Sequence, residues 1–370
     1  MKLERVIISG GGTGGHIFPA IAIADEIKKR FPTCHILFVG AEGKMEMDRV
    51  PKAGYKIKGL PIQGFQRKFT LSNLKLPFKI IQSLLKARKI IKDFRPQLVI
   101  GVGGYASGPT LKMANFIGIP TLLQEQNSYP GKTNKLLAQK AAAICTAYPN
   151  MDRFFPKEKI QLTGNPVRSD MVDIENKKEQ AITHFKLDPS KPTILVIGGS
   201  LGAKTLNKSI KHGMEKLDLA GVQVIWQCGR LYHADLSISV SRRNLPSIHL
   251  HQFIDRMDLA YAVADVVISR AGAISVSELC IVAKPTILVP SPNVAEDHQT
   301  KNAMALVEAN AAVYVKDDES RNTLVQTTLD LISDSSKKFK LSEEIQKFGK
   351  PNATKEIVDC CESIAIKKWK

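Results

Sequence analysis

The sequence contains no long apolar run. No stretch approaches the roughly 18 to 20 consecutive apolar residues that a helix needs to cross a bilayer, which argues against a membrane-spanning chain. The first apolar stretch is short and runs directly into glycines, so it lacks the apolar region and cleavage site of a secretory signal. We therefore expect the chain to remain in the cytoplasm.

Cysteine pairs of the C-x-x-C type are also missing. The six cysteines are spread along the chain, and no histidine stands near them at the spacing of a zinc site. We expect buried, reduced thiols and no metal site.

Acidic residues are scarce in the first part of the chain. The whole chain has 53 Lys and Arg against 35 Asp and Glu, a net charge of +18. Residues 1–150 hold 23 basic and 8 acidic side chains, whereas the remaining 220 residues are nearly balanced at 30 and 27. Such a field favours an anionic partner, and composition leaves open nucleic acid, an acidic membrane surface or a phosphorylated substrate.

The length and composition are those of a globular protein with two domains. Of 370 residues, 44% are hydrophobic and 24% are charged. Apolar strands at residues 5–9 and 193–197 each run into glycines and then into a helical pattern. The strands and helices continue to alternate, which predicts an α/β protein with two Rossmann-like, doubly wound parallel-sheet domains facing a deep cleft.

The turn-rich segment 163–168 marks the expected domain boundary. We predict a first domain at 1–164, a second at 165–345, and a C-terminal helix within 346–370 that packs back on the first domain.

The first glycine loop, residues 10–15, satisfies the pattern G-x-G-x-x-G between a strand and a helix. Backbone amides at such a helix start bind phosphate, so the pattern fits NAD enzymes, nucleotide-sugar enzymes and other phosphate binders. A dinucleotide site also needs an acidic residue at the end of the second strand, and Glu42 is predicted to lie two residues beyond it. His16 follows the loop at the helix entrance, where an imidazole can accept a proton near neutral pH.

Other candidates follow later strands of the first half. A glycine turn at 103–109 follows one strand, and Glu125, Gln126 and Asn127 follow the next. Because the carboxyl ends of parallel strands line the ligand crevice, this polar cluster is a candidate binding site.

In the second half, small residues in segment 269–278 precede a predicted helix, and the start of that helix is suited to binding a diphosphate. Glu278, one turn into that helix, is placed to accept hydrogen bonds from a ribose diol. A later loop carries Asp297, His298 and Gln299 at another expected strand end.

Seven segments occur together in the order found in the MurG family of bacterial glycosyltransferases: GGGTGGHIFPAIAIA, GVGGYASGP, LLQEQN, TGNPVR, GGSLGAKTLN, SRAGAISVSE and EDHQTKNA. The chain resembles this family over essentially its whole length. The resemblance implies a GT-B fold and an inverting hexosyl transfer without metal or cofactor. The donor would be UDP-GlcNAc, and the acceptor would be the C4 hydroxyl of MurNAc in undecaprenyl-pyrophosphoryl-MurNAc-pentapeptide (lipid I). The product would be lipid II, for peptidoglycan synthesis.

The resemblance also implies roles for individual residues. Arg168 and Ser200 would bind the donor diphosphate, Ile254 would contact uracil through its backbone, and Glu278 would bind the ribose hydroxyls. The other implied substrate contacts are Thr13, Gly14, Gly15, Asn127, Ala273 and Gln299. His298 stands where other members carry a glutamine. His16 is the candidate general base, and Glu125 is the alternative.

Residues 65–95 contain nine basic residues and one acidic residue, interleaved with apolar side chains. A solvated amphipathic helix explains part of this pattern. We favour a peripheral membrane patch, because the acceptor is an anionic lipid. Its expected members are Arg67, Lys68, Lys75, Leu76, Phe78 and Lys79. The expected location is the cytoplasmic face of the bacterial inner membrane, without a nucleic-acid partner and with cell-wall synthesis proteins as potential partners.

Three rival functions remain open to test. Another GT-B glycosyltransferase or a UDP-sugar epimerase of similar architecture would not require a polyprenyl diphosphate acceptor. A nicotinamide-dependent dehydrogenase would use the first glycine loop for its cofactor. A non-catalytic basic scaffold would bind membrane or RNA without turnover.

Overall fold

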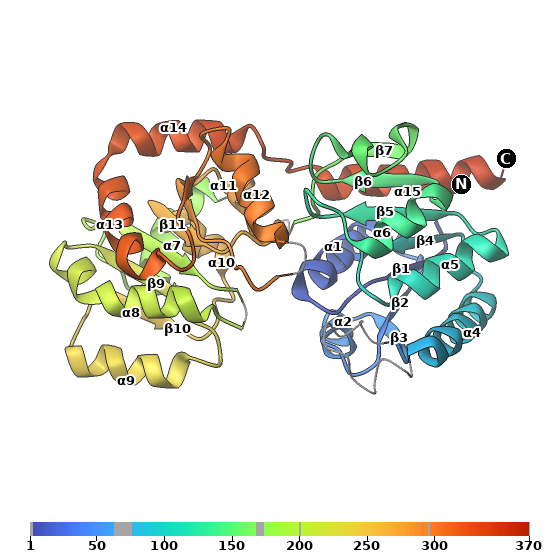
Figure 1. Ribbon diagram of the computed structural model, residues 1–370, viewed down its shortest axis with the longest axis horizontal. Coiled ribbons are helices and arrows are strands. Elements are labelled where there is room, and N and C mark those ends of the chain that lie inside the picture. Colours follow the sequence, from blue (N-terminus) through green and yellow to red (C-terminus); the bar gives the residue numbers. More distant parts are fainter. Residues whose placement is uncertain (1–2, 63–75, 168–173, 200, 295–296, 370) are drawn as a thin grey trace. The chain divides into compact units, whose positions relative to one another are not determined.

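The computed structural model describes residues 3–62, 76–167, 174–199, 201–294 and 297–369, which form two compact units (Figure 1). Unit 1 comprises residues 1–167 together with 351–370, and unit 2 comprises residues 168–350. Each unit is a parallel sheet covered by helices. The two Rossmann-like domains predicted from the alternation of strands and helices are therefore confirmed.

The sheet of unit 1 has seven strands in the order β3-β2-β1-β4-β5-β6-β7, and every neighbouring pair is parallel. The strands are β1 (Arg5–Ser9), β2 (His35–Ala41), β3 (Lys56–Leu60), β4 (Leu98–Gly101), β5 (Thr121–Glu125), β6 (Ala143–Thr146) and β7 (Ile160–Leu162). The order reverses between β1 and β4, so the crevice at their carboxyl ends is the expected ligand site of such a sheet.

Helices cover both faces of this sheet. They are α1 (Gly14–Arg30), α2 (Glu46–Lys52), α4 (Leu76–Phe94), α5 (Ser107–Ile117), α6 (Lys132–Leu137) and α15 (Ala353–Trp369). The alternation of side chains along β1 explains the two layers. Val6 and Ile8 pack in the core that includes α1 and α15, whereas Ile7 packs in the core that includes α4 and α5.

The last helix, α15, belongs to unit 1 and packs against α1. Arg30 at the end of α1 donates hydrogen bonds to Asp359 at 2.5 Å, to Glu362 at 3.1 Å and to the backbone carbonyl of Lys355 at 3.0 Å. These contacts connect the first helix of the chain, α1, with the last, α15.

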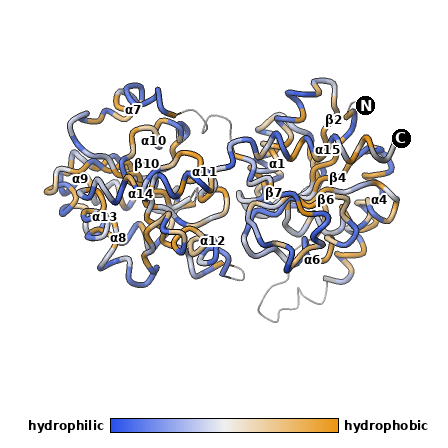
Figure 2. Tube along the Cα trace, turned by 90° about the horizontal axis from the view of Figure 1, so that it is seen from above, coloured by the Kyte–Doolittle hydropathy of each residue, from blue (hydrophilic) through white to orange (hydrophobic). Residues whose placement is uncertain are grey.

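Unit 2 repeats the architecture with six strands in the order β10-β9-β8-β11-β12-β13. The strands are β8 (Thr193–Ile197), β9 (Gln223–Gln227), β10 (Ile248–His251), β11 (Val266–Ser269), β12 (Thr286–Leu288) and β13 (Val313–Tyr314). The helices are α7 (Lys178–Phe185), α8 (Lys204–Leu219), α9 (His233–Arg243), α10 (Met257–Val263), α11 (Ala273–Val282), α12 (His298–Val307), α13 (Ser320–Ser333) and α14 (Ser335–Gln346). Figure 2 shows the hydrophobic stretches gathered inside each unit, where the strands run.

One detail differs from the sequence-based expectations. Strand β2 extends through Ala41, so Glu42 follows the strand directly and does not lie two residues beyond it. Helix α1 begins at Gly14, and Pro19 lies in its second turn. Because proline has no N–H, it removes the usual helical donor for the carbonyl of Gly15.

Candidate functional site

Two glycine loops of unit 1 interlock at the carboxyl ends of β1 and β4. The N–H of Gly11 donates to the carbonyl of Gly103 at 3.3 Å. Gly104 has a φ of +86°, and a Cβ there would lie only 2.3 Å from the carbonyl oxygen of Gly11. Glycine is required at this crossing because any side chain would separate the loops.

A buried carboxylate that the sequence analysis did not single out supports the first loop. Glu46, at the start of α2, is 1% exposed. One oxygen accepts from the N–H of Gly12 at 2.9 Å, and the other accepts from the N–H of Ala41 at 2.9 Å. A Cβ on Gly11 would lie 2.2 Å from the carboxylate. No local motif marks Glu46, so only the three-dimensional packing identifies it.

His16 lies in the first turn of α1 with its imidazole held by the loop. Its Nδ1 is 3.0 Å from the carbonyl oxygen of Gly11 and 3.3 Å from Oγ1 of Thr13. Because a carbonyl oxygen can only accept, this contact assigns the proton to Nδ1 and makes Nε2 the accepting nitrogen. The Nε2 edge faces Gly103: a Cβ atom placed on Gly103 would lie 2.9 Å from Nε2 of His16. The ring therefore sits between the two glycine loops.

Glu125, at the end of β5, is buried, and both of its carboxylate oxygens accept hydrogen bonds from residues that follow it in the chain. One oxygen accepts from the backbone and side-chain amides of Asn127, at 3.0 and 3.3 Å. The other accepts from the N–H of Gly131 at 3.2 Å and from Nδ2 of Asn134 at 2.9 Å. Burial raises the pKa of the Glu125 carboxyl, and these hydrogen bonds oppose that rise.

The segment TGNPVR is tied to the loop after β5 by amide side chains. Nε2 of Gln124 donates to Oδ1 of Asn165 at 2.9 Å, and Nδ2 of Asn165 donates to the carbonyl of Gln126 at 3.0 Å. Gln126 in turn donates to the carbonyl of Val102 at 2.8 Å, next to the second glycine loop. The loops after β4 and β5 and the TGNPVR segment thus form one hydrogen-bonded cluster.

In unit 2, helix α11 presents its amino terminus at the carboxyl end of β11. Gly272 is the N-cap, and no side chain caps this end, so the first backbone amides are suited to an anion. Ala273 is the first helical residue. Glu278 lies in the same helix, and the hydroxyl of the buried Tyr261 donates to its carboxylate at 3.3 Å.

Ile254, the residue predicted to contact uracil, follows β10. Its N–H donates to Oε1 of the buried Gln227 at 2.9 Å, while Nε2 of Gln227 donates to the carbonyl of Gly199 at 3.3 Å. Gln227 therefore connects the loop after β8 to the loop after β10. Sequence analysis did not identify this residue, because its two partners lie 28 and 27 positions away and approach it only in the fold.

The loop after β12 leads into α12, which begins at His298. Oε1 of Gln299 accepts from the N–H of Ser291 at 2.8 Å, so this residue is fixed across the loop. The buried Asn302 donates to the carbonyl of Ala271 at 3.3 Å, which links α12 to the start of α11.

The predicted membrane patch falls partly on α4. Phe78, Ile81 and Leu85 lie on one face of this helix and are 77%, 58% and 62% exposed. The opposite face, which includes Ala87 and Ile91, packs in the core. Lys79 lies beside the exposed face, and Leu76 is the first residue of the helix.

Several predicted residues lie outside the described part of the chain: Arg67, Lys68, Lys75, Arg168 and Ser200. Among the described residues, no helix is both long enough and apolar enough to span a membrane.

Two family domains match most of the chain and define its class. The glycosyltransferase family 28 N-terminal domain matches residues 6–146, and the glycosyltransferase family 28 C-terminal domain matches residues 193–357. The fold and its loops are therefore those of a glycosyltransferase.

Curated relatives specify the family further. The chain is 55% identical to the UDP-N-acetylglucosamine--N-acetylmuramyl-(pentapeptide) pyrophosphoryl-undecaprenol N-acetylglucosamine transferase of Flavobacterium psychrophilum, over 97% of each chain. The protein of the same name from Parabacteroides distasonis is 54% identical over 100% of both chains. The crystal structure of MurG from Acinetobacter baumannii is 29% identical, with a TM-score of 0.77 over 97% of this chain and 99% of that one. The chain belongs to the MurG family.

These matches confirm the resemblance seen in the seven sequence segments and argue against the dehydrogenase. Glu42 does follow β2, but its carboxylate pairs with Lys86 at 2.6 Å. The UDP-GlcNAc 2-epimerase of Neisseria meningitidis matches with a TM-score of 0.68 over 98% of this chain and 100% of that one, at 16% identity. That likeness shows the shared fold alone.

Proposed function

We propose that the chain transfers N-acetylglucosamine from UDP-N-acetylglucosamine to undecaprenyl-pyrophosphoryl-N-acetylmuramyl-pentapeptide, which yields lipid II. The observation that carries this proposal is the identity of 51% to 57% over nearly the whole chain with relatives named for this transfer. The uncapped start of α11 supplies backbone amides of the kind that a diphosphate donor needs.

The reaction would invert the anomeric centre by direct displacement. The C4 hydroxyl of MurNAc attacks C1 of GlcNAc from the face opposite UDP, and the bond from C1 to the diphosphate oxygen breaks. Negative charge then develops on the departing UDP. Backbone amides at the start of α11, together with Arg168, would stabilise that charge, and such preorganised electrostatics is usually the largest catalytic contribution.

We assign His16 as the general base that accepts the proton of the C4 hydroxyl. The carbonyl of Gly11 holds the proton on Nδ1, so Nε2 is the nitrogen able to accept another. Glu125 fits a different role, because each of its two oxygens already accepts two hydrogen bonds, from Asn127 and Gly131 in the loop after β5 and from Asn134 in α6. We assign it as a positioning residue.

The donor would be bound by unit 2. Glu278 would accept hydrogen bonds from the ribose hydroxyls, with Tyr261 fixing the orientation of its carboxylate. Ile254 would contact uracil, Ala273 and Ser200 the diphosphate, and Gln299 the sugar. In unit 1, Thr13, Gly14, Gly15 and Asn127 would contact the sugar and the acceptor.

The acceptor carries a polyprenyl chain, which requires access to a lipid surface. Phe78, Ile81 and Leu85 on the outer face of α4 are suited to enter the membrane interface, and the basic residues of the same helix are suited to anionic lipid. We propose that this face holds the enzyme on the cytoplasmic surface of the bacterial inner membrane.

The direct test measures UDP release from UDP-N-acetylglucosamine by the purified chain, with and without a lipid I analogue, in EDTA. Release that depends on the acceptor and resists EDTA supports the transfer and its metal-free character. Release without acceptor indicates hydrolysis or epimerisation. Donor binding without any release in the presence of acceptor contradicts the proposed reaction.

A further inference from the structure

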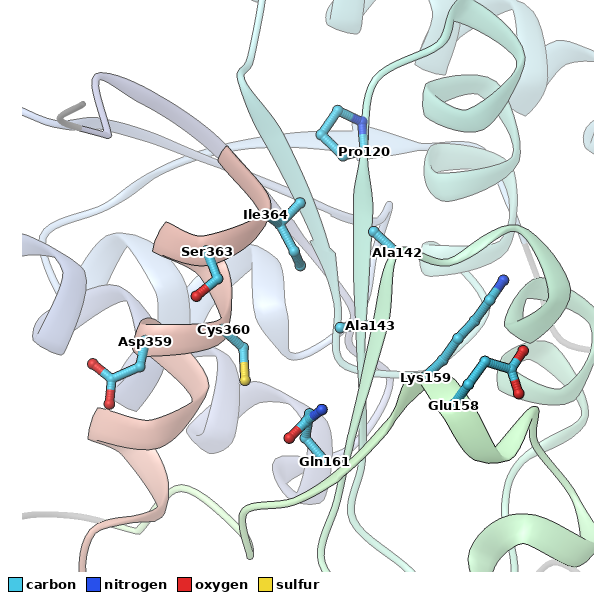
Figure 3. A pocket seen from close by; sticks show the side chains of 10 residues that line it. All are labelled: Pro120, Ala142, Ala143, Glu158, Lys159, Gln161, Asp359, Cys360, Ser363 and Ile364. Atoms are coloured by element: carbon cyan, nitrogen blue, oxygen red, sulfur yellow. The ribbon is translucent and has the colours of Figure 1, made fainter. Parts of the chain in front are cut away.

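A hollow of about 580 Å³ lies in unit 1 between α15 and the edge of the sheet (Figure 3). Pro120 and Ala142, which precede β5 and β6, line it, so it opens near the amino ends of these strands. The glycine loops follow carboxyl ends of the strands, so the hollow is separate from the glycosyltransferase site. Ile364 and Cys360 contribute the side of the hollow formed by α15.

The hollow is lined by a thiol that packs against the core containing a second thiol. Figure 3 shows the Cys360 side chain projecting from α15 on the side of Gln161. The second thiol is Cys145 in β6, a member of the core cluster against which Cys360 packs. Cys145 pairs in register with Gln161 of β7 and is 0% exposed. Cys360 itself is half-buried, so one thiol of the pair borders the hollow and the other lies behind it.

The surroundings favour ionisation of Cys360 over Cys145. The hydrogen bond from the Cys145 thiol stabilises a Cys360 thiolate and lowers the pKa of Cys360, although burial and the carboxylates of Asp359 and Glu356 oppose this effect. The same hydrogen bond and the deep burial of Cys145 raise the pKa of Cys145. Since the thiolate is the reactive form, Cys360 is the nucleophile of the pair.

The remaining cysteines lack this combination. Burial raises the pKa of Cys34 and of Cys228 to about 11, and that of Cys280 to about 12. Cys361, adjacent to Cys360, is 0% exposed, and burial raises its pKa as well. Reactivity is therefore expected at one of six thiols.

We propose that Cys360 is a site of thiol–disulfide exchange with small disulfides that enter the hollow, and that Cys145 is its resolving partner. The Cys360 thiolate attacks one sulfur of the small disulfide, forms a mixed disulfide and releases one small thiolate. Cys145 then loses its proton and attacks the Cys360 sulfur, which releases the second small thiolate. In total, two protein thiols are oxidised to one disulfide, and one small disulfide is reduced to two thiols.

The lining of the hollow indicates which small disulfides fit. Lys159 provides a cation, Glu158 provides a carboxylate, and Ala142 and Ile364 provide apolar surface, whereas the Asp359 carboxylate is already paired with Arg30. A peptide-like disulfide that carries both ammonium and carboxylate groups matches this lining, and glutathione disulfide is a suitable probe. The resulting bond would tie α15 to the central sheet of its own unit.

The experiment exposes the folded, full-length chain to glutathione disulfide at neutral pH and then blocks free thiols by alkylation. Peptides are digested without reduction and identified by mass spectrometry. Because Cys360 and Cys361 are adjacent, the linkage is mapped in C361S, where only Cys360 remains on that helix. We expect a peptide that joins Cys145 to Cys360 in both the parent chain and C361S.

Two variants separate the steps. C145S should stop at a stable mixed disulfide on Cys360, whereas C360S should lose the linkage. Alkylation of Cys360 in the untreated chain should be at least about tenfold faster than alkylation of the other five cysteines. The proposal is overturned by linkage that forms only in denaturant, by an unmodified Cys360 in C145S, or by equal alkylation rates. Circular dichroism of each variant identifies any that fails to fold.

Discussion

The Nδ1 atom of His16 lies 3.0 Å from the carbonyl oxygen of Gly11, and this contact orients the imidazole between two glycine loops. The partner is a backbone atom, so the contact depends on the loop conformation and not on another titrating side chain. Glu46 in turn fixes that loop by accepting from the N–H of Gly12 at 2.9 Å. The orientation of the candidate base therefore depends on a carboxylate in the next helix.

Replacement of His16 tests its assignment as the general base. A general base typically contributes a factor of about 10² to 10⁴, so H16A should lower kcat by that amount while donor binding is retained. The acidic limb of the pH dependence of kcat/KM should disappear with it. H35A is the matched control, because His35 is exposed at the start of β2. Steady-state kinetics and UDP binding measure both effects, and near-normal turnover by H16A would remove the assignment.

Replacement of Glu125 distinguishes a positioning role from catalysis by that carboxylate. E125Q keeps the shape, but its amide nitrogen cannot accept the hydrogen bonds that one carboxylate oxygen accepts. We expect a loss of about 1 to 3 kcal/mol in the free energy of unfolding. Activity should fall, while the acidic limb of the pH profile persists. Loss of that limb in E125Q, with the limb retained in H16A, would reverse the two roles.

The local signals in the sequence were sufficient for the architecture. An apolar strand, a glycine turn and a helix each leave a short-range pattern, and β1 with α1 and β8 with α8 follow it. The short edge strands β3, β7 and β13 were not predicted. The edge strand β3 carries Lys56 and Lys58 on either side of an apolar residue. Charged side chains of this kind protect an edge strand from pairing with other chains. They also weaken the hydrophobic pattern by which a strand is predicted.

The supporting residues of the site were harder to predict than its loops. Gln227 and Asn165 act through partners that lie 27 to 41 positions away in the sequence. Glu46 acts through Gly12, 34 positions away, as well as through the nearby Ala41. Asn165 lies in the segment TGNPVR, but nothing in the immediate sequence of Glu46 or Gln227 distinguishes them from other polar residues. Their roles follow from strand order, which brings distant loops together.

Glu46 offers a test of this supporting layer. In E46Q, the amide nitrogen would face the N–H of Ala41 or of Gly12, so one buried donor loses its acceptor. We expect a loss of about 1 to 3 kcal/mol in stability and a lower kcat. D48N is the control, since Asp48 is 64% exposed in its pair with Lys52 and should change stability by less than about 1 kcal/mol. Urea unfolding measures both variants, and equal effects would contradict a special role for Glu46.

The outer face of α4 provides the test of membrane binding. Phe78, Ile81 and Leu85 are exposed on the face opposite the core, so replacing all three by serine should preserve folding but remove apolar surface from the interface. We expect binding to vesicles with anionic lipid to weaken at least about tenfold, since burying one such side chain fully contributes about 1.5 to 3 kcal/mol. L219S, at a leucine 89% exposed in unit 2, is the matched control. Vesicle co-sedimentation measures affinity, and turnover with a short-chain acceptor in detergent checks that the site is intact. If the triple variant binds vesicles like the parent chain, the membrane-binding surface lies elsewhere; if it also loses turnover on the soluble acceptor, α4 contributes to the site itself.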